Sequence, residues 1–319
     1  MILAALVLLA PPGWAERTEL ALATEVTLVL PAATPTAAFD RAFEAVRAVD
    51  YVANEWRPGS PLAEANRRAG QAVSVPPLLA GLLQRALDYA ALSDGAFDPT
   101  WAALWGLWDF DRAVIPAADA VAARLPRIGW RSVRLSGGTL TTARQQVLGL
   151  GGIAKGWALD QAAAALAQLR VHHGLLTAGG QTLALGSRDG VAWRVAVEGP
   201  RGGEPLRLAV CGRPTLSVST SADNARYFER GGVRYHHLLD PSTGYPARRA
   251  LSATVLADDA TAADALSTAC FVLGPRGCQE KLLTQRGVLA VRVVAPDGAA
   301  SQSAALPVLS PGAPPPPCR

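Results

Sequence analysis

The sequence predicts an α+β protein built from mixed helices and antiparallel sheets, and three observations favour this class. The 319 residues are 50% hydrophobic and 18% charged, which suffices for a large buried core. Helical patterns dominate the first half of the chain, whereas short strand patterns dominate residues 175–256. The sequence has no internal repeat, heptad run or dinucleotide-binding glycine fingerprint, and segregated helices and strands argue against a doubly wound sheet.

The helices of the first half are predicted from apolar periodicity and from their ends. Phe39 and Phe43 repeat at helical spacing in the first helix, and Pro76-Pro77 opens the second. A strand-like alternation at 19–30 comes before them, and Gly137-Gly138 marks a hairpin. Helices are expected at 36–55, 76–92, 117–125 and 155–169.

The second half alternates short apolar runs with turn residues, which is typical of strands. Strands are expected at 175–185, 193–197, 206–210, 215–218, 233–239, 251–256 and 288–294. Two helices, at 260–273 and 276–284, separate the last two of these strands.

The two ends of the chain differ in composition from the predicted folded domain between them. An uncharged apolar run at residues 2–10, followed by Gly13-Trp14-Ala15, predicts a signal peptide at 1–15 with cleavage before Glu16, the alternative being an ordinary N-terminal strand. The protein is therefore expected to be exported to the periplasm, where association with the inner membrane is a further option. Residues 306–319 are Pro-rich and are expected to be a disordered tail, which leaves 16–305 as the folded domain.

Charge and cysteine content narrow the function classes. The formal net charge is only +4 and no basic cluster interleaves with aromatic residues, so nucleic acid is not an expected partner.

Of the four cysteines, Cys270 and Cys278 are expected either to pair across a helix-turn-helix or to remain buried thiols. Cys318 lies in the predicted tail.

Residues 235–246 are the most informative segment of the chain. Two of the four histidines in the chain, His236 and His237, lie in this segment at the end of a predicted strand. Asp240-Pro241 followed by Thr243-Gly244 predicts a tight turn, because Pro fixes φ and Gly accepts a positive φ. The segment alone is also compatible with a simple β-turn that carries no chemistry.

Four segments together resemble the ApbE family of flavin transferases, which move FMN from FAD onto a protein hydroxyl. They are 93–100 (SDGAFDPT), 151–156 (GGIAKG), 237–244, which matches the family pattern H-x-x-D-P-x-T-G, and 263–269 (ADALSTA). The segments occur in the family's order, and the resemblance spans roughly residues 20–295. It implies an ApbE-like, T-fold-like structure with two lobes and the flavin site between them.

The resemblance implies Mg²⁺-dependent transfer of FMN from FAD to a Thr or Ser hydroxyl of an acceptor protein, with release of AMP. FAD is then a substrate, and the acceptor is expected to be a subunit of a membrane redox complex. Two alternatives stay open: an FAD pyrophosphatase that uses water, and a non-catalytic FAD-binding protein for maturation or storage.

The same resemblance assigns catalytic and metal-binding residues. His237 is the candidate general base, since imidazole titrates near neutral pH, and strand alternation aims His236 the other way. Asp264 and Thr268 lie four residues apart on one face of a predicted helix, and the family's metal ligands fall on them and on the carbonyl of Gly152. Without the resemblance, Asp264 would simply favour the helix dipole and Thr268 would bond a carbonyl.

The flavin nucleotide is expected to contact residues from several segments. The family's flavin-binding positions fall on Leu22, Trp56, Ala96, Phe97, Asp98, Lys155 and Leu238. Lys155, beside several glycines, is expected to meet a phosphate as a point charge, the alternative being a solvated lysine at a helix start. Four positions depart from the family pattern: Gly149 replaces an Asp, Ala23 and Ala222 each replace a Gly, and Asn224 replaces a Tyr.

Overall fold

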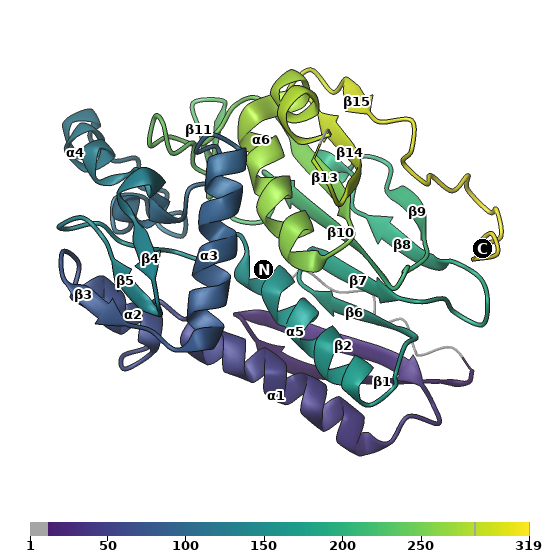
Figure 1. The fold of residues 1–319 in the computed structure, drawn as a ribbon. Helices are drawn as coiled ribbons and strands as arrows, with labels where there is room; N and C mark the ends of the chain where they lie inside the picture. The colour runs from purple at the N-terminus through teal and green to yellow at the C-terminus, as the bar shows by residue number, and fades with distance from the viewer. Residues whose placement is uncertain (1–11, 284, 319) are drawn as a thin grey trace.

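The computed structural model describes residues 12–283 and 285–318 and confirms the α+β class (Figure 1). Its centre is an eight-stranded sheet in which every neighbouring pair is antiparallel. In sheet order the strands are β1 (Trp14–Ala21), β2 (Thr24–Pro31), β6 (Gly174–Ala178), β7 (Gln181–Leu185), β10 (Thr215–Ala222), β13 (Ser252–Ala257), β14 (Val288–Val294) and β15 (Ala300–Gln302).

Helices cover one face of this sheet. Figure 1 shows α1 (Thr36–Val52), α5 (Ala154–Gln168) and α6 (Ala260–Leu282) lying across it, with α3 (Pro77–Leu92) beside α6. Alternate strand residues such as Leu28, Leu183 and Val255 point into the core that these helices close. Burial of this continuous apolar layer is the main stabilising contribution to the fold.

The opposite face of the sheet is covered by a hairpin of β8 (Trp193–Val197) and β9 (Leu206–Val210). Trp193 and Leu208 of this hairpin share a second core with Trp14, Val218 and Leu256 of the sheet. Because apolar layers lie on both faces, all six residues of β13 are buried.

A smaller part of the molecule lies beyond α3 in Figure 1. It contains α2 (Pro61–Arg67), β3 (Ala72–Ser74), β4 (Arg134–Ser136), β5 (Thr139–Thr141), α4 (Ala118–Arg124) and the 3₁₀ segment η1 (Pro99–Leu104). A separate hairpin of β11 (Tyr227–Arg230) and β12 (Val233–His236) leads into the predicted turn, where Gly244 has a φ of 75° as expected.

Several element predictions are confirmed, and others need correction. The ranges of β8, β9 and β14 match the expected strands, and α6 is broken at Gly274, between the two helices expected there. The single strand expected at 19–30 is instead the hairpin of β1 and β2, because Leu22 and Ala23 adopt positive φ values of 54° and 57°. Apolar alternation continues through that turn and conceals it.

The expectation of a disordered tail is wrong for residues 306–318. Leu309 N donates to Arg207 O at 2.8 Å, and Ala192 N donates to Pro316 O at 2.9 Å. Prolines lack an N–H, but their carbonyls still accept, so a Pro-rich segment can satisfy the hairpin's backbone donors. A disulfide between Cys211 and Cys318 fixes the end of this segment, residues 306–318, which we call the C-terminal strap.

The remaining expectations concern the N-terminus and the other cysteine pair. Residues 1–11 lie outside the described part of the chain, and β1 begins at Trp14, before the predicted cleavage site. Cys270 and Cys278 form a disulfide across the break in α6, which is the first of the two alternatives. Within residues 12–283 and 285–318, no helix combines the length and apolar character needed to cross a bilayer.

Candidate active site

The site begins where α5 and α6 meet at Gly156. A Cβ at this position would lie 2.1 Å from the carbonyl oxygen of Ala260, so only glycine allows the two helices to approach this closely. The backbone N–H of Gly156 donates to Oδ2 of Asp264 at 3.0 Å. The predicted metal ligand is therefore oriented by the start of α5.

Asp264 and Thr268 follow each other along the same side of α6. Asp264 is buried, and the Thr268 hydroxyl lies 3.3 Å from Ser221 Oγ on β10. Ser221 Oγ also lies 3.0 Å from Ser267 Oγ, which in turn lies 3.2 Å from Ser219 Oγ. This group of hydroxyls fixes α6 to the sheet. Sequence analysis assigned no role to Ser219 or Ser267, since no local pattern reveals a serine's partner on another element.

Gly152 lies between α6 and the segment that follows α3. A Cβ built on Gly152 would be 3.3 Å from Cε2 of Phe97 and 3.4 Å from the Thr268 hydroxyl. The predicted ligands Gly152, Asp264 and Thr268 thus come from two segments far apart in sequence and meet at one place.

Lys155 lies at the same place. Its Nζ donates to Gly151 O at 2.9 Å and stands 3.4 Å from Oδ1 of Asp264. A Cβ on Gly179 would lie 3.8 Å from Cδ of Lys155 and 3.4 Å from the Thr24 hydroxyl. The lysine stem therefore lies beside the β6–β7 turn, which is itself next to the β1–β2 turn that contains Leu22.

The donor set at this place suits a hard divalent cation. It offers one carboxylate, one hydroxyl and backbone carbonyls, all oxygen atoms. Mg²⁺ is commonly held by one or two carboxylates together with waters and substrate phosphates. Within the part of the chain that the structure describes, no group of three or more His, Cys, Asp or Glu side chains could hold a metal.

The two histidines of the 235–246 segment have different surroundings. Nδ1 of His237 lies 3.3 Å from Arg226 O, and since a carbonyl only accepts, this nitrogen carries the proton and leaves Nε2 free to accept. Burial lowers the pKa of His237 to about 4, and the nearby cationic side chains of Arg226 and Lys155 act in the same direction. Its side chain is therefore neutral at physiological pH.

His236 is fixed in the protein interior. It is 4% exposed, one ring nitrogen lies 2.9 Å from Ala247 O, and its ring packs edge-on against Phe271. Burial lowers its pKa to about 4. The structure gives it a packing environment distinct from that of His237, as the alternation of the strand predicted.

The predicted flavin contacts differ in how they are placed. Ala96 and Phe97 are buried, and both oxygens of Asp98 are already used, Oδ1 by Thr100 N at 2.8 Å and Oδ2 by Trp130 N at 3.0 Å. Asp98 thereby caps η1 at its start. Burial raises the pKa of Asp98.

The other predicted contacts are more open. Trp56 is 68% exposed. Leu22 and Leu238 are half-buried against the main core, with Leu22 N donating to Asp50 Oδ1 at 3.0 Å and Leu238 O accepting from Ala247 N at 2.9 Å.

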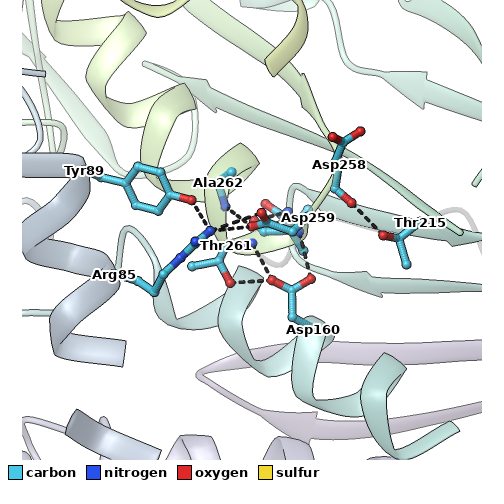
Figure 2. A network of polar contacts seen from close by, with 10 residues as sticks. Arg85, Tyr89, Asp160, Thr215, Asp258, Asp259, Thr261 and Ala262 are labelled. Atoms are coloured by element: carbon cyan, nitrogen blue, oxygen red, sulfur yellow. Dashed lines mark hydrogen bonds and ion pairs between the residues drawn. The ribbon is translucent and has the colours of Figure 1, made fainter. Parts of the chain in front are cut away.

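A second network holds the beginning of α6 (Figure 2). Asp160 of α5 accepts from Ala260 N at 2.9 Å and Thr261 N at 2.8 Å, and Arg85 of α3 bonds Asp259, the N-cap of α6. Burial, reinforced by the nearby Asp259, raises the pKa of Asp160 to about 6. A cavity of about 690 Å³ adjoins this network, and none of the predicted site residues lines it.

Comparison with known proteins identifies the family. The model of the ApbE family matches residues 22–292. The chain belongs to the ApbE family. A Treponema pallidum protein named FAD:protein FMN transferase is 40% identical in a 266-residue alignment that covers 76% of this chain and 73% of that protein.

Two further ApbE comparisons extend this result. A Rhodobacter capsulatus protein with the same name is 36% identical over 76% of this chain, but this chain covers only 47% of it. The crystal structure of an ApbE protein from Thermotoga maritima superposes with a TM-score of 0.83 at 33% identity and covers 91% of this chain and 97% of that one. The ApbE fold expected from the sequence motifs is therefore confirmed.

Proposed function

We propose that this protein transfers FMN from FAD to a Thr or Ser hydroxyl of an acceptor protein in a Mg²⁺-dependent reaction that releases AMP. The observation that carries the proposal is the convergence of Gly152, Asp264 and Thr268, with the Lys155 ammonium 3.4 Å from the Asp264 carboxylate. The ApbE relatives named FAD:protein FMN transferase supply the substrate and the reaction class.

Each residue has a definite task in this reaction. Asp264, Thr268 and the Gly152 carbonyl would hold the cation, which neutralises the pyrophosphate when bound. Lys155 offers a compact positive charge to a phosphate oxygen. Positioning and charge neutralisation are the main contributions that proteins make to phosphoryl transfer.

His237 would act on the acceptor hydroxyl. The hydroxyl oxygen forms a bond to the FMN phosphorus, the bond from that phosphorus to the bridging oxygen breaks, and AMP leaves with that oxygen. The hydroxyl proton passes to Nε2 of His237, whose other nitrogen is held by Arg226 O. In this tautomer the unprotonated Nε2 is able to accept that proton.

The test uses purified protein, FAD, Mg²⁺ and candidate acceptors, followed by mass spectrometry of the acceptor and quantification of AMP. FMN addition to an acceptor Thr or Ser together with AMP supports the proposal. AMP without acceptor modification would show a pyrophosphatase, and FAD retention without AMP would show a binding protein.

We also propose export to the periplasm with a signal peptide at 1–15, and an acceptor that belongs to a membrane redox complex facing that compartment. The two disulfides support export, because such bonds persist in oxidising compartments. Cleavage before Glu16 would remove Trp14 and with it the bond from its Nε1 to Asp189 Oδ2 at 3.1 Å. N-terminal sequencing of periplasmic material should begin near Glu16, and retention of Met1 would refute the signal peptide.

A further inference from the structure

Three tryptophans lie together beside residues 149–152 of the candidate site, here called the glycine loop. The rings of Trp56 and Trp105 are 4.3 Å apart between centroids and inclined by 36°, and Trp101 meets Trp105 edge-on at 5.9 Å. Trp105 follows η1 directly, whereas Trp56 comes from the segment after α1. Trp105 therefore supports a ring that is 68% exposed and belongs to a distant part of the sequence.

Gly149 is the position that makes room for Trp105. A Cβ built there would lie 2.9 Å from Cζ2 of Trp105, 2.9 Å from Cβ of Ala102 and 3.4 Å from Nε1 of Trp101. Gly149 is buried, and it is not among the residues with positive φ, so its backbone conformation does not require glycine. The requirement is space for the indole ring.

The tryptophans also belong to the candidate site by connection. Gly149 N donates to Pro99 O at 2.8 Å, which joins the glycine loop to η1. Three residues later, Gly152 packs between Phe97 and the Thr268 hydroxyl. Displacement of Trp105 would thus act on a surface next to the proposed metal ligands.

We infer that Trp105 is a positioning residue that holds Trp56 as a stacking platform for the isoalloxazine ring, and that Gly149 is glycine in order to seat Trp105. This inference rests on the proposed function, since it concerns the flavin end of FAD. A large planar ring stacks well on an indole face, and such a pair contributes affinity beyond its buried area. An indole supported from behind by a second indole loses less rotamer freedom when the flavin binds.

The experiment compares the affinities of FAD and ADP, both with Mg²⁺, for the full chain and its variants. ADP shares the adenine nucleotide of FAD but lacks the flavin ring. Trp105→Ala should weaken FAD binding about two- to tenfold, should reduce the quenching of flavin fluorescence on binding, and should leave ADP affinity unchanged. Gly149→Ala should act in the same direction, because its methyl group displaces Trp105.

Two further variants keep the test decisive. Trp105→Phe retains a smaller aromatic support and should give an intermediate FAD affinity, which covers the case in which Trp105→Ala does not fold. Trp193→Phe, in the core on the other face of the sheet, is the matched tryptophan control and should change neither affinity.

Equal losses of FAD and ADP affinity in Trp105→Ala would reveal a merely structural role and overturn the inference. Unchanged FAD affinity and quenching in that variant would overturn it too, while leaving the proposed function intact. A wild-type protein that binds no FAD would overturn both. A wild-type protein that binds FAD with the expected variant pattern, but transfers nothing, would refute only the proposed function.

Discussion

Gly156→Ala is the substitution for which the structure gives the sharpest expectation. The added methyl group would lie 2.1 Å from Ala260 O and 2.5 Å from Ala260 C, whereas ordinary contact begins near 3.4 Å. The two helices must therefore separate by about 1.3 Å at this point. Neither neighbour is a flexible side chain that could turn away.

The expected cost follows from this displacement. Overpacking of this kind typically costs about 1–3 kcal/mol, which corresponds to a fall in Tm of several degrees for a chain of this size. Without the clash, Ala in place of Gly inside a helix would instead stabilise it by about 1 kcal/mol. The sign of the change in Tm therefore tests the close approach of α5 and α6.

The same shift should reach the candidate site, because Gly156 N donates to Asp264 at 3.0 Å. A misplacement of about 1 Å commonly costs about a hundredfold in rate. Thermal unfolding and FMN transfer would be measured for Gly156→Ala and for Gly151→Ala, whose Cβ meets no atom within 4 Å and should leave Tm unchanged. A stable Gly156→Ala protein with wild-type transfer would refute the reasoning.

Three other outcomes are expected. Asp264→Ala should lower the rate of Mg²⁺-dependent transfer more than 100-fold, since loss of a residue that merely supports a metal ligand already costs roughly 10- to 100-fold. Activity retained at the same Mg²⁺ concentration would refute the metal assignment. His237→Ala should slow transfer about a hundredfold with FAD affinity kept, while His236→Ala should mainly lower Tm because its buried ring packs on Phe271; an equal rate loss for both would point to the wrong imidazole. Since the pKa of His237 is lowered to about 4, kcat/KM should persist from pH 7 to about 5.5 and fall only near pH 4 as the base is protonated, and an acid midpoint near 6.5 would contradict this.

The fold was predictable from the sequence where the apolar pattern and the turn or helix-breaking residues indicate the same element boundary. The strands β8, β9 and β14 are short apolar runs bounded by turn residues, and Gly274-Pro275 marks the break in α6. The turn at Leu22-Ala23 was missed because residues with a side chain occupy positive φ there, where Gly or Asn would have been a signal. The tail was missed because composition cannot reveal that proline carbonyls accept from the β8–β9 hairpin.

The motif residues of the candidate site were predictable from the sequence, but the residues that hold them in place were not. The spacing of Asp264 and Thr268 on a helix is visible in the sequence. The serine hydroxyls, however, join a strand to a helix that is distant in sequence. Ser219 and Ser221 on β10 lie 48 and 46 residues before their partner Ser267 on α6. Such contacts depend on how the sheet and α6 pack, and no local pattern records them.

The C-terminal strap closed by Cys211 and Cys318 has a consequence for biosynthesis. The two cysteines are 107 residues apart, and Cys270 and Cys278 are made between them. If the protein is exported as proposed, its growing chain enters an oxidising compartment and offers Cys211 two wrong partners before its own appears. Four cysteines allow three pairings, so the yield of correctly joined chains should depend on disulfide exchange late in synthesis, and thiol–disulfide isomerases should raise it.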